Sequence, residues 1–500
     1  MIVLKLIDHD YNYEVSDILR MYFGKSEIRS EEALADSQSF LQSEDYLVIS
    51  ALCKDNGKYV CTSEISTKDR NEKHSEILDA SEPSQKDLKR LIKKSMYKLM
   101  TKVFDKEFPW GILTGIRPVK IVHDLLDKGF PKESIINRLQ SEYLMSRDRA
   151  ELSLEIANIE RPFIYPMRDN SLSLYIGIPF CPSRCHYCSF TSNPISRFKD
   201  SVDTYVESLM KEIKEVSNYL NNEGFSVQTV YIGGGTPTVL NEIQLKRLID
   251  CINNCFSRSF EEFTCEAGRP DSINAAKLQA MKAGGVTRIS INPQTMKNET
   301  LRRIGRVHST ESVLKSFAMA REAGFRNINM DMIVGLPGEK LDSVAYTLDE
   351  IKKLAPDSVT VHTMAIKRAS VYNEHFKEIE LPDDDEVSAM MEYTKEFLRG
   401  MNMHPYYLYR QKHMLQNLEN IGFSRKGLEC IYNMQIIEEK QTIVAFGADA
   451  VTKVVIGSEN RIERQHNIKD VKLYINNVDE MIKKKIEQLK IINNTIYINT

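Results

Sequence analysis

Hydrophobic positions in the middle of the chain alternate between two patterns. Short runs rich in β-branched residues favour strands, and longer stretches with apolar residues three and four positions apart favour helices. The expected strands are residues 172–178, 227–232, 263–266, 286–291, 328–334 and 359–364. Between the first two lies SVDTYVESLMKEIKEVSNYL, whose apolar residues fall on one helical face. Strict alternation of strand and helix predicts parallel pairing with right-handed crossovers.

Six such units predict an α/β fold built on a closed or partial (β/α)6 barrel of the TIM type. In these barrels the loops after the carboxyl ends of the strands carry the chemistry. Residues 1–165 differ, with a first strand at 2–7 and helices around KDLKRLIKKSMYKLMTKVF, which predicts an α+β domain. We therefore expect three domains: residues 1–165, a barrel core at 166–400, and a carboxyl-terminal α/β extension at 401–500 that covers the substrate.

Charge and hydropathy exclude several classes of protein. The 500 residues carry 67 Lys and Arg against 70 Asp and Glu, for a net charge of −3, so no global positive field attracts nucleic acid. No window is apolar enough for a membrane span, and Lys5 and Asp8 interrupt the first apolar run too early for a secretion signal. We expect a cytoplasmic protein with reduced thiols. The Lys-rich runs at 89–98 and 483–485 are interpreted as solvated helix faces.

Three of the nine cysteines lie together in GIPFCPSRCHYCSF, directly after the first barrel strand. Cys181, Cys185 and Cys188 form a C-x3-C-x2-C array whose thiolates converge, which predicts a bound metal centre. Zinc takes four ligands, and His186 would have to be the fourth although its position beside Cys185 turns its ring away. A four-cysteine cluster needs another nearby cysteine, and residues 189–200 contain none. The array favours a 4Fe-4S cluster with one iron left open.

The remaining residues of chemical interest are interpreted structurally. Six other cysteines are expected to be buried thiols, and His308 and His362 to be packed, hydrogen-bonded histidines. These cysteines are Cys53, Cys61, Cys251, Cys255, Cys265 and Cys430.

With its C-x3-C-x2-C array after the first strand, the chain resembles the radical S-adenosylmethionine (SAM) superfamily. The segments YIGIPFCPSRCHYCSF, VYIGGGTPTVL, IGRVHS and NINMDMIVGLPGE narrow the resemblance to the oxygen-independent coproporphyrinogen III oxidase group. PWGILTGIRPVK and PYYLYRQK are similar to segments of the HemZ branch of that group. The resemblance covers essentially the whole chain. It implies a 4Fe-4S cluster held by the three cysteines, with SAM on the open iron, and it allows a second SAM molecule.

The resemblance also implies which residues contact SAM. Tyr175 corresponds to a contact of the SAM carboxylate, and Tyr187 to a residue against the adenine. The three glycines after the second strand, with Thr236, would let the backbone approach the methionine ammonium group. Arg306 and Asp331 could instead pair with each other in the barrel interior. The full set of expected SAM contacts is Tyr175, Tyr187, Gly233, Gly234, Gly235, Thr236, Glu266, Gln294, Arg306, Asp331 and Ala365.

For the substrate, the resemblance implies a tetrapyrrole. Aromatic and basic residues in PYYLYRQK suit a flat ring with propionates, so Tyr407, Arg410 and Lys412 are the expected substrate contacts, with a structural role as the alternative. The implied reaction is radical oxidative decarboxylation of coproporphyrinogen III to protoporphyrinogen IX in haem biosynthesis. It requires a low-potential electron donor of the flavodoxin or ferredoxin type and an electron acceptor.

One residue departs from this pattern. Group members with established decarboxylase activity carry a further cysteine two residues after the third cluster cysteine, where this chain has Phe190. CHYCSF instead resembles the haem-chaperone branch. Alternative functions are therefore a haem-binding chaperone, or a radical SAM methyltransferase or ring-opening enzyme acting on haem.

Overall fold

The computed structural model describes residues 1–24, 26–30, 45–68, 70–115, 117–168, 170–190, 192–256, 259–367, 370–374, 379–411, 414–456 and 461–496. The chain divides into two compact units, one of residues 1–155 with 416–418 and the other of residues 156–415 with 419–500. The expected domain boundaries at 165 and 400 stay predictions, because this division rests on compactness alone.

The amino-terminal unit contains a five-stranded sheet in the order β2-β1-β3-β4-β5. Its strands are β1 (Ile2–Ile7), β2 (Ile28–Ser30), β3 (Tyr46–Asp55), β4 (Lys58–Ser66) and β5 (Asn71–Leu78). Its helices are α1 (Asn12–Phe23), α2 (Gln85–Phe104), α3 (Val119–Asp127), α4 (Lys132–Tyr143) and the first part of α5 (Arg147–Ile164). The expected first strand and long helix are confirmed. The antiparallel strands β3, β4 and β5 were not predicted.

The second unit is built on a parallel sheet whose central strands follow the chain order. The six barrel strands are β6 (Ser171–Ile178), β9 (Ser226–Gly234), β10 (Glu262–Glu266), β11 (Arg288–Ser290), β12 (Ile328–Val334) and β13 (Ser358–Thr363). Each pairs in parallel with the next. Two further short strands, β7 (Phe180–Cys181) and β8 (Asn193–Pro194), pair beside this sheet. The predicted (β/α)6 arrangement is confirmed, with all six strands in the expected places.

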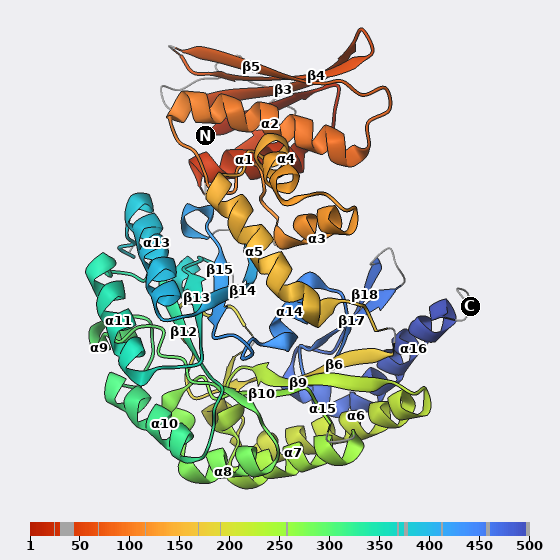
Figure 1. Ribbon diagram of the computed structural model, residues 1–500, viewed down its shortest axis with the longest axis vertical. Helices are drawn as coiled ribbons and strands as arrows, with labels where there is room; N and C mark the ends of the chain where they lie inside the picture. The colour runs from red at the N-terminus through yellow and green to blue at the C-terminus, as the bar shows by residue number, and fades with distance from the viewer. Residues whose placement is uncertain are drawn as a thin grey trace. The chain divides into compact units, whose positions relative to one another are not determined.

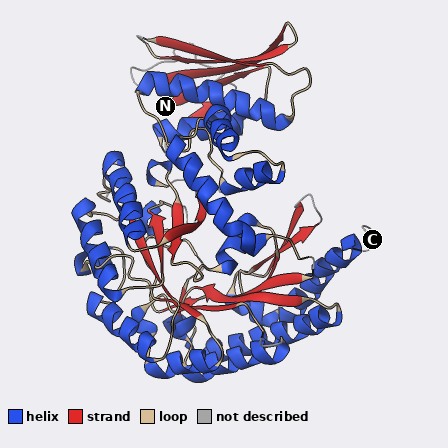
Figure 2. Cartoon of the chain, viewed as in Figure 1, coloured by secondary structure: helices blue, strands red, loops and turns tan. Residues whose placement is uncertain are grey.

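Helices cover the outer side of this curved sheet (Figures 1 and 2). They are α6 (Val202–Asn222), α7 (Glu242–Cys255), α8 (Ala275–Ala283), α9 (Asn298–Arg303), α10 (Thr310–Glu322), α11 (Leu341–Leu354) and α13 (Asp384–Gly400). The short α12 (Val371–Glu374) instead contacts the loop after β7, where the Tyr372 amide donates to the His186 carbonyl oxygen at 3.1 Å. Helix α6 buries Val206, Leu209 and Ile213 along one face, as its apolar spacing predicts. The inner side and the carboxyl ends of the strands are thereby left for the site.

Residues after 400 extend the same sheet at both ends. β14 (His404–Tyr409) and β15 (Asn420–Ser424) lie beyond β13, whereas β16 (Thr442–Phe446), β17 (Val451–Ile456) and β18 (Arg461–His466) lie beyond β6. The sheet therefore has the order β14-β15-β13-β12-β11-β10-β9-β6-β16-β17-β18. Helices α14 (Ile431–Glu438), α15 (Val471–Asn476) and α16 (Val478–Ile496) complete this α/β extension.

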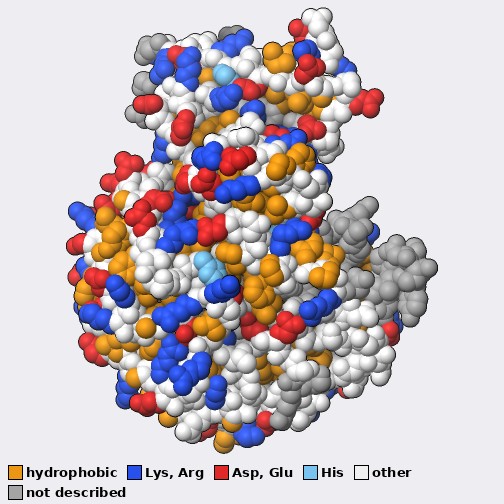
Figure 3. All heavy atoms as spheres, in the orientation of Figure 1, with side chains coloured by type: hydrophobic (Ala, Val, Ile, Leu, Met, Phe, Trp, Pro, Cys, Tyr) orange, Lys and Arg blue, Asp and Glu red, His pale blue; other side chains and the backbone are white. Residues whose placement is uncertain are grey.

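Charged residues follow the sequence expectation with one exception. Acidic and basic side chains are both spread over the face drawn in Figure 3, as the small net charge predicts. Among the described residues, no helix is both long and apolar enough to cross a bilayer. The expectation that residues 483–485 are all solvated was wrong. Lys485 is fully buried and pairs with Glu212 of α6, because α16 packs this side of its surface against α6.

Candidate functional site

The three expected cluster cysteines lie in a tight loop after β6. Cys181 ends β7, and the Cys188 amide donates to the Cys185 carbonyl at 3.1 Å, which closes the turn. Burial raises the pKa of Cys181 to about 11, and the nearby Cys185 and Cys188 add to the rise. Three thiols that are buried or half-buried in one loop lose their protons readily only beside a positive charge, which a metal centre supplies. The loop therefore fits a metal cluster.

His186, which lies between the second and third cysteines, contacts the end of α9. Its Nδ1 donates to the Arg303 carbonyl oxygen at 3.1 Å, and its backbone amide donates to the Ile304 carbonyl oxygen at 3.0 Å. The ring also packs edge-on against Tyr372. His186 thus fastens the cysteine loop to the end of α9, as its place in the sequence suggested.

The glycines after β9 allow the backbone to lie against the cysteine loop. Gly234 has a φ of 106°, which favours glycine. A Cβ atom at Gly235 would lie 2.5 Å from the Phe180 carbonyl oxygen and 3.0 Å from Cys181 Sγ. The Thr236 hydroxyl donates to Cys181 Sγ at 3.4 Å. The GGGT segment is therefore shaped by its contact with the first cysteine.

Glu266, at the end of β10, is a buried carboxyl group on the wall of the site. The Tyr231 hydroxyl donates to its Oε1 at 2.5 Å. Burial raises the pKa of Glu266 to about 7. The hydrogen bond from Tyr231 opposes this rise, and the nearby Asp331 adds to it. This carboxyl therefore changes charge near neutral pH.

Gln294 and Asp331 lie beside each other on neighbouring segments. The Gln294 amide donates to the Asp331 carbonyl oxygen at 2.9 Å, and Gln294 has a φ of 67°. The side-chain Oε1 of Gln294 is buried without a hydrogen-bond partner in the described chain. A buried amide oxygen left in this way needs a donor, such as a ligand hydroxyl or ammonium group.

Arg306 and Asp331 have separate partners. Arg306 Nη1 donates to the Asn292 carbonyl oxygen at 2.6 Å, and its Nε donates to the Tyr187 hydroxyl at 3.3 Å. Asp331 accepts from Asn329 Nδ2 at 2.7 Å. Burial raises the pKa of Asp331, but hydrogen bonding from His362 and Asn329 brings it below its ordinary value. No ion pair between Arg306 and Asp331 appears in the part of the chain that the structure describes.

These residues line one cavity of about 560 Å³ within the second unit. Of the expected site residues, the cavity wall includes Tyr175, Cys181, Cys185, Tyr187, Cys188, Gly234, Gly235, Thr236, Glu266, Gln294, Arg306, Asp331, Ala365 and Tyr407. Gly233 lies beside Glu266, where a Cβ atom would be 3.1 Å from its Oε1. Arg410 is 2% exposed and is not part of the wall. Lys412 lies outside the described residues.

The wall also contains residues that the sequence did not single out. Some alternate along strands, as Arg288, Ser290 and Asn292 do along and just after β11, and this alternation is the signal that could have identified them. Others are aromatic. The ring of Tyr432 stacks on that of Tyr231 with 4.5 Å between centroids, and Tyr407 stacks on Tyr409 at 6.2 Å. His362, expected to be structural, also lines the cavity and contacts the Tyr409 hydroxyl at 3.3 Å.

The other cysteines are only partly as expected. Cys61, Cys251, Cys265 and Cys430 are buried, but Cys53 is exposed and Cys255 is half-buried. Cys430 donates to Glu262 Oε1 at 3.2 Å, outside the cavity wall.

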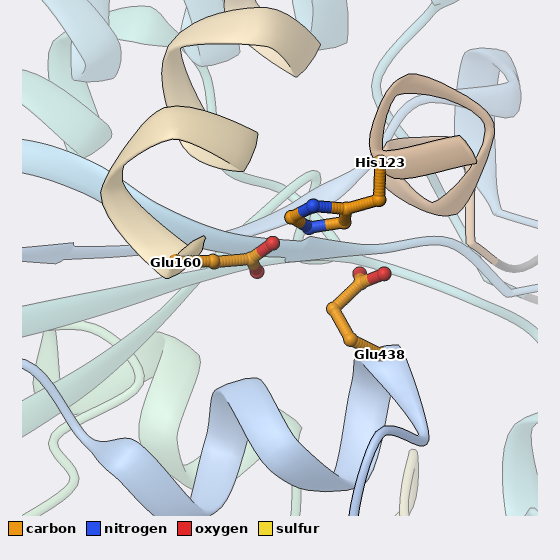
Figure 4. A group of neighbouring side chains, drawn as sticks. All are labelled: His123, Glu160 and Glu438. Atoms are coloured by element: carbon orange, nitrogen blue, oxygen red, sulfur yellow. The ribbon is translucent and has the colours of Figure 1, made fainter. Parts of the chain in front are cut away.

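A pair of buried carboxyl groups also lies outside the cavity wall. Glu160 on α5 and Glu438 on α14 have oxygens within 4.8 Å of each other (Figure 4). Burial raises the pKa of Glu160 well above its ordinary value, and Glu438 adds to the rise. His123, also drawn in Figure 4, belongs to the amino-terminal unit.

Comparison with known proteins identifies the family. Residues 175–351 match the Radical SAM superfamily. The chain is 39% identical over 386 residues to the oxygen-independent coproporphyrinogen-III oxidase-like protein HemZ of Bacillus subtilis, which covers 76% of this chain and 77% of that protein. The chain belongs to the HemZ-like family of radical SAM proteins. The cofactors of this family are a 4Fe-4S cluster and SAM, as expected from the sequence.

Two further relatives of the HemZ-like chain are named for different functions. The haem chaperone HemW of Bacillus subtilis is 32% identical over 312 residues, covering 62% of this chain and 76% of that protein. The structure of the radical SAM enzyme coproporphyrinogen III oxidase (HemN) of Escherichia coli is similar with a TM-score of 0.51 and 25% identity, covering 65% of this chain and 73% of that one. The family thus includes both an enzyme and a chaperone.

Proposed function

We propose that this protein is a radical SAM enzyme that oxidatively decarboxylates coproporphyrinogen III to protoporphyrinogen IX. The single observation that carries the proposal is the cavity, where the three clustered thiols, the expected SAM contacts and a wall of tyrosines meet. Relatedness to HemZ and HemN supports a tetrapyrrole as the substrate.

In this proposal each group of residues has a distinct task. Cys181, Cys185 and Cys188 hold three irons of the cluster, and the glycine segment with Gln294 and Asp331 binds SAM. When bound, the cluster and SAM supply the radical chemistry that removes a hydrogen atom from a propionate side chain. Loss of that hydrogen, carbon dioxide and one electron converts the propionate to a vinyl group. The buried wall excludes water from the reacting side chain.

Radical SAM enzymes need an electron donor, and we infer a flavodoxin- or ferredoxin-type protein. The electron released by the substrate passes to a separate electron acceptor.

An anaerobic incubation tests the proposal. Reconstituted protein with SAM, reductant and coproporphyrinogen III is expected to give protoporphyrinogen IX, measured by chromatography of the oxidised tetrapyrroles. The Cys188→Ala protein serves as the matched control and is expected to give none. Unchanged coproporphyrinogen with a fully loaded cluster would contradict the proposed reaction.

Phe190 favours a second candidate function. Decarboxylases of the group carry a cysteine at this position, and the CHYCSF sequence is similar to the haem-chaperone branch. A chaperone would bind haem in a one-to-one complex and would form no 5′-deoxyadenosine in response to coproporphyrinogen III. Haem titration followed by absorbance, together with 5′-deoxyadenosine analysis, separates the two functions.

A further inference from the structure

Phe190 and Lys367 form a pair on the cavity wall beside the third cluster cysteine. Phe190 lies two residues after Cys188 and is 66% exposed, although its ring is large and apolar. Lys367 lies shortly after β13, and its Nζ is 5.3 Å from the centroid of the Phe190 ring. Both side chains line the same cavity as the cysteines. The pair thus lies at the cysteine end of the cavity.

Fewer polar partners surround the charge of Lys367 than surround the other cationic side chains that line the cavity. Arg269 pairs with Asp271 at 2.9 Å, and Arg306 donates to backbone carbonyl oxygens. Arg288 donates to the Ser358 hydroxyl. Lys367 Nζ, in contrast, makes no hydrogen bond or ion pair within the described part of the chain and lies over the Phe190 ring.

A half-buried ammonium group of this kind is poorly solvated. An anion bound beside the ammonium group would replace the hydrogen bonds to water that burial removes. The exposed face of the Phe190 ring beside it offers a surface for a flat apolar group.

We propose that Lys367 and Phe190 form a subsite for one propionate-bearing ring of the tetrapyrrole. The ammonium group of Lys367 binds the propionate carboxylate, and the Phe190 ring packs against the pyrrole. The subsite holds a propionate at the cluster end of the cavity, where the reacting side chain must lie. This inference rests on the proposed function and replaces the expected role of Arg410, which is buried outside the cavity wall.

Tetrapyrrole binding to the cluster-loaded full-length protein tests the subsite. The probe is coproporphyrin III, the flat oxidised form, titrated by its absorbance. We expect Lys367→Gln to weaken binding about tenfold, as for the loss of one charge-assisted hydrogen bond. Lys367→Arg should bind as the unaltered protein does, because it keeps the charge. Lys484→Gln, a change on α16 outside the cavity wall, is the matched control and should have no effect.

A second ligand separates the carboxylate from the ring. In the propionamide derivative of coproporphyrin III the side chains are neutral, so Lys367→Gln should not weaken its binding. Phe190→Ala should weaken binding of both ligands, because it removes the packing surface from each. Iron content and the unfolding temperature of every variant show that the proteins compared are folded and loaded.

The outcomes distinguish this inference from the proposed function. Equal affinity of the unaltered and Lys367→Gln proteins for coproporphyrin III would overturn the subsite while leaving the proposed function standing. If Lys367→Gln changed only the reduction potential of the cluster, Lys367 would be a partner of Cys188, and the subsite would again be wrong. Failure of the unaltered protein to bind any tetrapyrrole would contradict the proposed function and the subsite together.

Discussion

Burial alone does not distinguish the cysteines that matter. Cys265 and Cys430 are as fully buried as any residue of the core, whereas Cys188 is only half-buried. The difference is that Cys181, Cys185 and Cys188 share one loop on the cavity wall. This grouping is visible in the sequence because all three lie within eight residues of one another. The spacing of the cysteines is therefore the strongest residue-scale signal in the chain.

Replacing one of the three cysteines should abolish the cluster. We expect Cys188→Ala to lose iron and sulfide, because two thiolates do not hold the cube. Cys251→Ala is the matched control, since Cys251 is buried on α7 away from the cavity wall. Iron and sulfide analysis after anaerobic reconstitution provides the measurement. Full iron in the Cys188→Ala protein would show that the ligand assignment is wrong.

Loss of Asp331 or Arg306 should weaken SAM binding while the cluster stays assembled. Each removes a charged group from the cavity wall, and such a hydrogen bond contributes about 1.5 to 3 kcal/mol, or roughly tenfold to hundredfold in affinity. Calorimetric titration of SAM into the Asp331→Ala and Arg306→Ala proteins measures the effect. Because Asp331 and Arg306 have separate partners, unaltered affinity in both would assign them to separate structural contacts.

Glu266 should make SAM binding depend on pH. Its pKa is raised to about 7, so the carboxyl is protonated below that pH and ionised above it. An ionised carboxylate accepts hydrogen bonds from a ribose diol more strongly, so affinity should rise severalfold between about pH 6 and pH 8. Glu266→Gln cannot ionise and should give a flat profile over the same range. A profile shared by both proteins would assign the pH dependence to another group.

At the scale of elements, the local pattern of apolar residues in the sequence was enough to predict the strands that are buried on both faces. The expected strand at 328–334 coincides with β12, because β-branched and apolar residues fill most of its length, with Asn329 and Asp331 as the exceptions. β5 (NEKHSEIL) was missed because most of its residues are polar, whereas β3 (YLVISALCKD) is largely apolar and carried a strand signal that was overlooked. β16 pairs in parallel with β6 although more than 260 residues separate them in the sequence, and no local sequence pattern predicts this pairing.

Lys485 illustrates the same limit, because a lysine run carries no sign of what packs against it. Glu212, its partner, also accepts from the Tyr474 hydroxyl at 2.6 Å and the Gly447 amide at 2.9 Å. Lys485→Ala leaves this carboxylate buried without its cation, so we expect a loss of about 3 to 5 kcal/mol in the free energy of unfolding. Urea denaturation measures the loss. Lys484→Ala, with its side chain half exposed, is the control and should change stability by less than about 0.5 kcal/mol. Equal stability of the two variants would contradict this account.

At the scale of the whole molecule, the sequence predicted the family and the barrel, but only part of the cavity wall. Residues in short motifs, such as the glycines and Asp331, could be placed because a motif fixes their position at a strand end. Lys367, His362 and Tyr432 could not, because no motif marks them. His362 and Lys367 come from the end of β13 and Tyr432 from α14, and they meet only when the sheet curves. Arg410 suited a propionate in composition, yet its place at the end of β14 buries it. Composition suggests the ligand, whereas topology decides which residues reach it.

The central claim is that this cavity brings a tetrapyrrole propionate to SAM for hydrogen removal. The most direct measurement uses coproporphyrinogen III carrying deuterium on the propionate carbons attached to the rings. Anaerobic turnover with SAM and reductant is followed by mass spectrometry of the 5′-deoxyadenosine. The account predicts that deuterium appears in 5′-deoxyadenosine in step with the formation of vinyl product. 5′-Deoxyadenosine without deuterium, formed at the same rate with and without the tetrapyrrole, would contradict it.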